Sequence, residues 1–337
     1  MSVDSAGSLY IHFAKLVEPK FDRMRKVINL KRPDRMPCGD MALMEYRPDI
    51  YHLGHPEFAV TPGEVGVSQD GKTKYTADGG VWAVGDAEKY RDYNDVLSCD
   101  PETFEVEEVG PAMLVEMARL YAAKVQVGFP VPWHYGTLIT RATIEFGWEP
   151  FLMASAIGPE KFGKILDRFG QASLAVVKGW TEIEGTELID IHDDIAGTHG
   201  VFMSPEWYRE YVFPWYRRMF DAIHEEGRKA IYVSDGNYMS VLDDILEAGA
   251  DGLYIESTSM DPGEFMRRAG RDKLFLIKSD SRNIDFGAPD DIYEELKNLR
   301  ELHEEFPGMM MYRGGGNPKP GNVEAFNCYF QELLVYE

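Results

Sequence analysis

The feature that most constrains this chain is a repeated pattern in which a short apolar run ends in a polar residue and a turn, and a helical stretch follows. The clearest case is the run Ala230 to Val233, which is followed by Ser-Asp-Gly-Asn at 234–237. Four apolar or aromatic residues in a row are typical of a buried strand, and the turn places the carboxylate of Asp235 at its carboxyl end. Similar runs end at His192, Glu256, Lys278 and Arg313.

This alternation predicts an α/β fold, a (β/α)8 TIM barrel, in which the carboxyl ends of all strands meet on one face. Any parallel sheet ends its strands in polar loops, but so many ionisable strand ends favour a shared functional site on this face. We call this site the mouth of the barrel. Helices are predicted at 111–124, 159–183, 204–226 and 289–306, with a kink at Pro214 in the third. Seven strand candidates are clear and an eighth is not. The first is a short strand that ends at Asp40, and the others lie at 125–129, 188–192, 230–233, 252–255, 274–277 and 309–312.

The chain is predicted to be one domain, 1–337, with an N-terminal helical segment before the first strand. Between residues 45 and 100, Gly, Pro, Asp and Tyr become dense, and Val67 to Tyr75 is typical of a hairpin around Asp70-Gly71. The region is too short and polar for a core of its own. We therefore expect an inserted β-hairpin elaboration that covers one end of the barrel.

Composition bounds the class of protein. A formal net charge of −22 without a basic stripe excludes nucleic acid as a partner and disfavours anionic membrane surfaces. The three cysteines are too few and too scattered for a disulfide framework or a CxxC metal site. No signal peptide or membrane-spanning run is apparent, so we expect a cytoplasmic protein without a membrane partner.

The mouth is expected to be rich in oxygen ligands. Such a set can hold a divalent metal such as zinc, or act without metal as a general acid, because clustered carboxylates raise one another's pKa. The same residues can instead cap a loop, satisfy a turn or fill the core. The candidate catalytic residues are Asp194, Asp235, Glu256, His192 and Asp193, with His199 nearby, and the metal candidates among them are His192, Asp194, Asp235 and Glu256.

Aromatic and cationic side chains complete the predicted mouth. An aromatic loop is expected after the strand at 125–129, and it can line a pocket for a flat or apolar substrate or pack on the core. Lys278 and Arg313 follow later strands and can bind an anionic group. The candidate substrate-binding residues are Trp133, His134, Tyr135, Tyr232, Lys278 and Arg313.

Three groups of residues resemble the uroporphyrinogen decarboxylase superfamily, most closely its corrinoid (cobalamin)-dependent methyltransferase branch. They are Lys31 to Pro37; Asp193 to Gly197 with Met203 to Tyr208; and Ser234 to Asn237 with Glu247 to Gly252. The resemblance covers most of the chain. It implies a (β/α)8 barrel with its site at the carboxyl ends of the strands.

Two departures from the family pattern reduce the number of reactions that this chain is expected to catalyse. The decarboxylases carry an arginine-rich segment after the first strand that grips a polycarboxylate porphyrinogen, whereas Asp40 to Arg47 keeps a single arginine. The thiol-methylating members bind zinc through a His-x-Cys pair and a later Cys, and the matching places here are Val233, Asp235 and the turn at 313–316. Porphyrinogen decarboxylation and thiol methylation are therefore both disfavoured.

The resemblance then implies a corrinoid-dependent methyltransferase that takes a methyl group from a small O-methyl donor, such as a methoxylated aromatic, and passes it to a corrinoid protein. The corrinoid sits on that partner, and a homodimer is compatible with the sequence. Two alternatives stay open. One is a decarboxylase or lyase of a small carboxylate that uses Arg313 or Lys278, and the other is a non-catalytic binding subunit.

Overall fold

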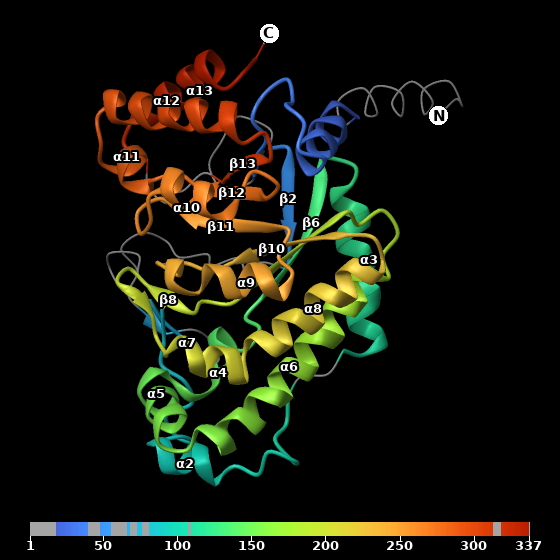
Figure 1. Ribbon diagram of the computed structural model, residues 1–337, viewed down its shortest axis with the longest axis vertical. Helices are drawn as coiled ribbons and strands as arrows, with labels where there is room; N and C mark the ends of the chain where they lie inside the picture. Colours follow the sequence, from blue (N-terminus) through green and yellow to red (C-terminus); the bar gives the residue numbers. More distant parts are fainter. Residues whose placement is uncertain are drawn as a thin grey trace.

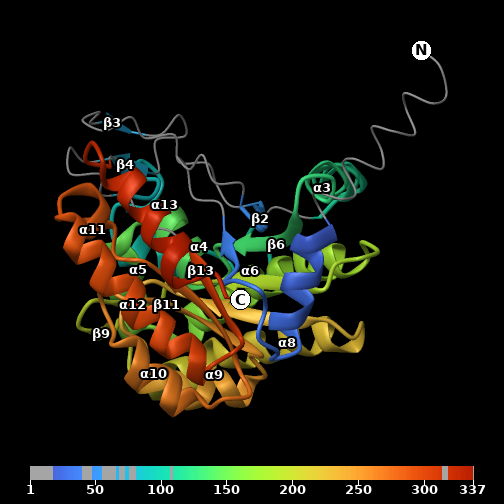
Figure 2. The ribbon, with the colours of Figure 1, turned by 90° about the horizontal axis from the view of Figure 1, so that it is seen from above.

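The computed structural model describes residues 18–39, 48–54, 66–67, 73–75, 81–106, 109–312 and 318–336. Within these ranges eight parallel strands close into a barrel in the order β1, β13, β12, β11, β10, β7, β6, β2, so the predicted (β/α)8 barrel is confirmed (Figures 1 and 2). The barrel strands are β1 (Cys38–Gly39), β2 (Ile50–Leu53), β6 (Phe129–Tyr135), β7 (Leu188–His192), β10 (Lys229–Val233), β11 (Gly252–Glu256), β12 (Leu274–Lys278) and β13 (Met309–Tyr312).

Helices cover the outside of the barrel close to their predicted positions (Figure 1). The helix expected at 204–226 is split at Val212, two residues before Pro214 and close to the predicted kink. The helices are α2 (Tyr93–Ser98), α3 (Pro111–Lys124), α4 (Ile139–Phe146), α5 (Trp148–Ile157), α6 (Pro159–Thr181), α7 (Pro205–Tyr211), α8 (Phe213–Glu225), α9 (Leu242–Ala248), α10 (Pro262–Ala269), α11 (Ser281–Asp285), α12 (Pro289–Glu305) and α13 (Asn322–Leu333), with a 3-10 turn η1 (Met239–Val241). None of the helices in these ranges is long and apolar enough to cross a membrane.

The barrel strand that was not recognised in the sequence lies inside the region expected to be an elaboration. Ile50–Leu53 forms β2, which pairs with β1 and with β6 and so closes the barrel. The strand has only four residues, and Pro48-Asp49 and Gly54 bound it, so its surroundings resemble a loop. The rest of the elaboration agrees with the expected hairpin, because β3 (Gly66–Val67) pairs antiparallel with β4 (Thr73–Tyr75), and β5 (Val81–Ala83) joins them.

Strand β6 begins later in the chain than expected. The prediction of a strand at 125–129 followed by an aromatic loop was wrong, because the strand begins at Phe129 and runs through Tyr135. Its two prolines, Pro130 and Pro132, lie where β6 pairs only with β2, before pairing with β7 begins at Trp133. Proline lacks the N–H needed for a ladder with two neighbours, and the sequence therefore imitates a loop.

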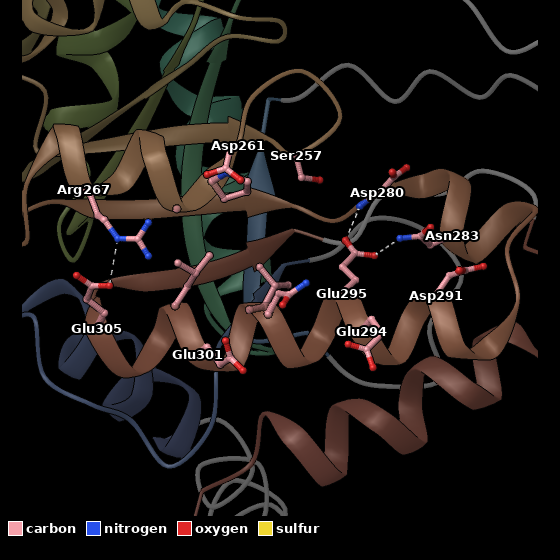
Figure 3. Close-up of a pocket in the computed structure, with 15 residues that line it drawn as sticks. Ser257, Asp261, Arg267, Asp280, Asn283, Asp291, Glu294, Glu295, Glu301 and Glu305 are labelled. Carbon is pink, nitrogen blue, oxygen red and sulfur yellow. Dashed lines mark hydrogen bonds and ion pairs between the residues drawn. The ribbon is translucent and has the colours of Figure 1, made fainter.

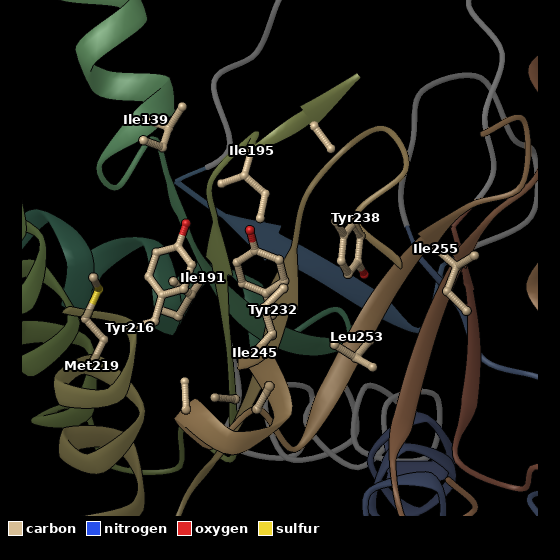
Figure 4. Packing of buried hydrophobic residues seen from close by; sticks show 14 of the residues in the cluster. Ile139, Ile191, Ile195, Tyr216, Met219, Tyr232, Tyr238, Ile245, Leu253 and Ile255 are labelled. Atoms are coloured by element: carbon tan, nitrogen blue, oxygen red, sulfur yellow. The ribbon is translucent and has the colours of Figure 1, made fainter. Parts of the chain in front are cut away.

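The strands lie between two apolar cores, one inside the barrel and one outside it. Inward-facing side chains of alternate strand residues fill the barrel, and Met24, Val27 and Ile28 of the helical residues 18–28 pack against the same cluster. The second core lies between the strands and the outer helices. There Tyr232 packs beside Tyr216 of α8, with Ile191 and Ile245 nearby (Figure 4).

A buried ion network ties the start of the barrel together. Asp49, immediately before β2, is fully buried, and its carboxylate lies 2.6 Å from Arg23 and 2.7 Å from Arg35. Asp49 also accepts a hydrogen bond from the backbone N–H of Cys38 at 3.1 Å, and Arg23 reaches Asp34 at 2.6 Å. The residues Lys31 to Pro37 that carry part of the family resemblance therefore anchor β1 to β2.

Candidate active site

The carboxyl ends of five neighbouring strands bring the predicted mouth residues together. Tyr135 ends β6, His192 ends β7, Glu256 ends β11 and Lys278 ends β12, while Asp194 and Asp235 follow β7 and β10. These strands are adjacent in the barrel, in the order β12, β11, β10, β7, β6. The convergence expected from the strand pattern is therefore present in space.

His192 is held between an indole and a carboxylate. The indole Nε1 of Trp133 donates to Nδ1 of His192 at 3.0 Å, and Nε2 of His192 lies 2.9 Å from Oδ1 of Asp194. Because an indole N–H can only donate, Nδ1 must present its lone pair. The arrangement that satisfies both contacts is a neutral imidazole with its proton on Nε2, directed at Asp194.

Opposing influences act on this histidine. Burial lowers the pKa of His192, but the charge of Asp194 and the hydrogen bond to it, together with the charges of Asp235 and Asp193, raise that pKa above its ordinary value. Although burial acts the other way, the imidazole lowers the pKa of Asp194, whose Oδ1 also accepts the backbone N–H of Asp235 at 2.9 Å. Asp194 is therefore a held, ionised acceptor at the base of the mouth.

Removal of the indole donor is expected to change the titration of His192. In Trp133→Phe the lone pair on Nδ1 loses the N–H that favours the neutral ring, so the pKa of His192 should rise further above its ordinary value. NMR titration of histidine-labelled protein measures the effect. Trp180→Phe, a buried tryptophan on α6 outside the barrel, is the matched control and should leave the titration unchanged. An unaltered His192 titration in Trp133→Phe would contradict the assignment.

Asp235 is the least constrained carboxyl group among the described mouth residues. Its side chain is 49% exposed, and its ion-pair contact is with Lys278 at 4.0 Å. Desolvation at the mouth, together with the negative charges of Asp194 and Glu256, raises the pKa of Asp235, although Lys278 opposes the effect. This carboxyl group therefore combines access to a ligand with a tendency to hold a proton.

Glu256 and Lys278 form a fixed pair beside it. Oε1 of Glu256 accepts from Nζ of Lys278 at 3.1 Å, while Oε2 accepts from the backbone of Gly236 at 3.0 Å and from Ser259 at 2.9 Å. Burial lowers the pKa of Lys278, but the carboxylates of Asp235 and Glu256 raise it above its ordinary value. Lys278 is therefore a neutralising cation for two carboxylates.

Asp193 has a different task from its neighbour. Its fully buried carboxylate accepts backbone N–H groups at the start of α4, from Leu138 at 3.1 Å, Ile139 at 3.0 Å and Thr140 at 2.8 Å. The hydroxyl of Tyr216 donates to it at 2.7 Å. Three backbone donors at the N-terminus of α4, with the hydroxyl of Tyr216 from α8, make Asp193 an anchor of α4 and not a group that meets a ligand.

Loss of the Tyr216 hydroxyl is expected to lower stability. Tyr216→Phe removes a fully buried hydrogen bond to a carboxylate, which contributes about 1.5–3 kcal/mol. Urea unfolding of the variant should show that loss. Tyr208→Phe removes a buried hydroxyl that donates to the backbone carbonyl of Ile195 at 2.8 Å, and it should cost about 1 kcal/mol. Equal losses in the two variants would speak against an ionised Asp193.

Two of the predicted substrate-binding residues, His134 and Tyr232, lie away from the mouth. Side chains alternate along a strand, so Trp133 and Tyr135 face the barrel interior while His134 faces the outer helices. Burial beside Arg141 lowers the pKa of His134 to about 3. Tyr232 is fully buried in the outer core, where its hydroxyl donates to the carbonyl of Asp193 at 3.1 Å (Figure 4). Arg313 lies outside the described residues, and His199 is exposed between β8 (Ala196–Gly197) and β9 (Gly200–Val201).

Sequence reasoning missed four interior residues at the floor of the mouth. Asp190 and Tyr254 each precede a predicted mouth residue by two positions and share its side of the strand. Tyr312 ends β13, and its ring centroid lies 5.8 Å from that of Trp133. His52 comes from β2, the strand that was not recognised. The spacing of two residues was a usable signal for Asp190 and Tyr254.

Comparison with known proteins identifies the family. The uroporphyrinogen decarboxylase (URO-D) family matches residues 113–307, which is more than half of the chain. This chain belongs to the uroporphyrinogen decarboxylase family. The family match includes Asp194, Asp235, Glu256 and Lys278, so the described mouth lies within it. No curated protein matches the chain significantly by sequence.

A solved structure with the same fold supports the barrel assignment. A methyltransferase from Methanosarcina mazei is similar with a TM-score of 0.61 and 16% identity, over 92% of this chain and 97% of that chain. A glycosylated endo-beta-1,4-xylanase from Gloeophyllum trabeum is more distant, with a TM-score of 0.45 and 12% identity, over 68% of this chain and 82% of that chain. The first likeness establishes a shared architecture across nearly the whole uroporphyrinogen decarboxylase-like chain.

The mouth of this family member does not fit the predicted metal set. Both ring nitrogens of His192 are engaged, by Trp133 and Asp194, and both oxygens of Glu256 accept hydrogen bonds. Across the described residues, no group of three or more His, Cys, Asp or Glu side chains is arranged to hold a metal ion. We therefore derive no step through a metal.

A groove on the outside of the barrel lies away from this site. It occupies about 770 Å³ between α10 and α12, and Glu295 and Glu305 point from α12 toward it (Figure 3). Its carboxylates are largely committed to local contacts. Glu295, for example, accepts from the backbone of Asp280 at 2.6 Å and from Asn283 at 2.9 Å. We assign it no part in the chemistry.

Proposed function

We propose that this protein is a corrinoid-dependent methyltransferase that takes a methyl group from a small O-methyl donor and passes it to a corrinoid carried by a partner protein. The observation that carries the proposal is the mouth itself. The carboxyl group of Asp235 is accessible and has a raised pKa. It lies beside polar side chains that are fixed by their own contacts, and aromatic side chains of the barrel interior lie beneath it. Demethylation of an ether requires such a proton donor, because an alkoxide or phenoxide is a poor leaving group.

Methyl transfer from an ether breaks the bond between the methyl carbon and oxygen, and both electrons of that bond go to oxygen. A reduced corrinoid on the partner protein would supply the electron pair for the new bond to the methyl carbon. Asp235 donates its proton to the departing oxygen and becomes a carboxylate. Lys278, 4.0 Å from Asp235 and 3.1 Å from Glu256, stabilises the negative charge that this transfer leaves behind.

The residues around Asp235 fix the turn that carries it and form the walls of the mouth. Asp194 accepts the backbone N–H of Asp235, and the backbone N–H of Gly236 donates to Glu256, so the Ser-Asp-Gly-Asn turn is tied on both sides. Gly236 has φ of +79°, and a Cβ there would meet the carbonyl oxygen of Ala196 at 2.4 Å, so only glycine fits. Tyr135, Tyr254 and Tyr312 supply aromatic walls that suit a methoxylated ring.

Two sequence observations support methyl transfer over the family's other chemistries. A single arginine in 40–47 is too few for a polycarboxylate porphyrinogen, and the cysteine ligands of a thiol-activating zinc are replaced. The likeness to a methyltransferase fold is consistent with this choice. A lyase that binds a substrate carboxylate through Lys278 would have to displace the two carboxylates that already neutralise it.

An anaerobic assay tests the proposal. The protein is mixed with cob(I)alamin and a panel of methoxyarenes and methylamines, and the absorbance change from cob(I)alamin to methylcobalamin is followed. We expect methylation with methoxyarenes and not with methylamines. Release of carbon dioxide from a small carboxylate, without any corrinoid, would instead establish the lyase. The assay is repeated with corrinoid proteins, since the free cofactor lacks the protein surface that a partner supplies.

A further inference from the structure

A second histidine and carboxylate pair lies in the barrel interior beneath the mouth. His52 comes from β2 and Asp190 from β7, the two strands that flank β6. Nε2 of His52 lies 3.4 Å from Oδ2 of Asp190, and the side chains are only 3% and 1% exposed. Apart from this contact, neither oxygen of Asp190 has a hydrogen-bond partner in the part of the chain that the structure describes. The proposed chemistry does not use this pair.

Stability does not explain why the pair is there. The barrel interior is otherwise mainly apolar, with Ile231, Val233 and Leu276 among its members, and burial raises the pKa of Asp190 although His52 opposes the effect. Taking a carboxylate out of water costs several kcal/mol, and replacement of a buried ion pair by apolar residues of similar size is often neutral or stabilising. A buried pair at this place therefore needs an explanation other than its contribution to stability.

The pair is in contact with the tryptophan that fixes His192. The ring of His52 meets that of Trp133 at 89° with centroids 4.6 Å apart, and that of Tyr312 at 79° with centroids 5.1 Å apart. Trp133 in turn donates to Nδ1 of His192. A Cβ on Gly39 would lie 3.2 Å from Cε1 of His52 and 3.0 Å from Cδ2 of Tyr312, so β1 leaves room for both rings.

We propose that His52 and Asp190 are positioning residues: Asp190 fixes the ring of His52, and His52 holds the indole of Trp133 in the orientation that donates to His192. His192 then keeps its proton on Nε2, where it faces Asp194. The sequence of contacts runs from β2 across β6 to the mouth. The inference rests on the proposed function in one respect, that the mouth is where reaction occurs, and its test does not require methyl transfer to be observed.

The test reads the tautomer of His192 directly. Protein with isotope-labelled histidine is examined by NMR of the ring nitrogens, and the His192 signals are identified by their loss in His192→Gln. Wild type should show the single tautomer protonated at Nε2. In the double variant His52→Leu/Asp190→Leu, we expect a mixture of tautomers or exchange-broadened signals, while the urea midpoint stays the same or rises. Asp190→Asn should keep the single tautomer, because the amide oxygen can accept from Nε2 of His52.

Two controls separate positioning from a structural role. His224→Leu disrupts an accessible pair of the same chemistry, in which Nε2 of His224 lies 2.7 Å from Asp251, and it should leave the His192 signals unchanged. If the double variant loses stability and His192 keeps its single tautomer, the pair is structural and the inference is wrong. Should the double variant not fold, Gly39→Ala crowds His52 and Tyr312 from β1, and unchanged His192 signals there would equally overturn the inference.

Discussion

Asp235→Asn is expected to lower the rate of methyl transfer by about 10²–10⁴-fold, the range that a positioned general acid contributes. The amide keeps the shape of the side chain and the backbone contact with Asp194, but it has no acidic proton to give to the departing oxygen. Single-turnover measurements with excess corrinoid isolate the step. The loss should appear in the rate constant and not in the affinity for the donor, because the proton is transferred only as the bond breaks.

The pH dependence gives a second reading of the same residue. An acid with a raised pKa works only while it is protonated, so the wild-type rate should fall as the pH rises through the pKa of Asp235, and the Asn variant should lack that fall. Asp280→Asn is the matched control. Asp280 follows β12, but its carboxylate is committed to Arg282 at 2.6 Å. An Asp235→Asn enzyme that transfers methyl groups at the wild-type rate would remove Asp235 from the mechanism.

Asp49→Ala is expected to lower the free energy of unfolding by about 3–5 kcal/mol, the range measured when one partner of a buried ion pair is removed. The variant removes the carboxylate shared by Arg23 and Arg35, whose side chains are only 7% and 10% exposed, and leaves Arg23 with Asp34 as its remaining ion-pair partner. It also removes the acceptor for the backbone N–H of Cys38 in β1. Urea unfolding followed by far-UV circular dichroism measures the loss.

Asp34→Ala is the control for this effect. Asp34 also binds Arg23, at 2.6 Å, but its side chain is 57% exposed, so water can replace it and the loss should be about 1 kcal/mol or less. A loss in Asp49→Ala no larger than that in Asp34→Ala would mean that the buried network does not anchor the barrel. Because Asp49 directly precedes β2, we also expect its loss to disturb the placement of His52.

The barrel was predictable because its later half has a plain physical signature. From β7 onward each strand is a short run of apolar residues bounded by turn residues, and each helix has caps or breakers at its ends. β2 and β6 lack that signature. Four residues next to Pro48 and a strand with two prolines are locally loop-like, and only pairing with their neighbours in the closed barrel makes them strands.

The candidate site was predictable to the extent that strand ends determine it. Asp194, Asp235, Glu256 and Lys278 converge because parallel strands end on one face. What the pattern did not give was the direction of each side chain and its partners. Asp193 and Asp194 are adjacent in sequence, yet one caps α4 and the other faces His192. His52 was missed because β2 was missed, and with it the interior pair.

Transfer of an isotopically labelled methyl group is the most direct test of the account. A methoxyarene labelled with carbon-13 in its methyl group is incubated anaerobically with the protein and cob(I)alamin, or with a corrinoid protein, and the products are followed by NMR. The account predicts that the label moves to the corrinoid and that an equal amount of the phenol appears. Label that stays on the donor, or that is released as methanol in the absence of corrinoid, would contradict it.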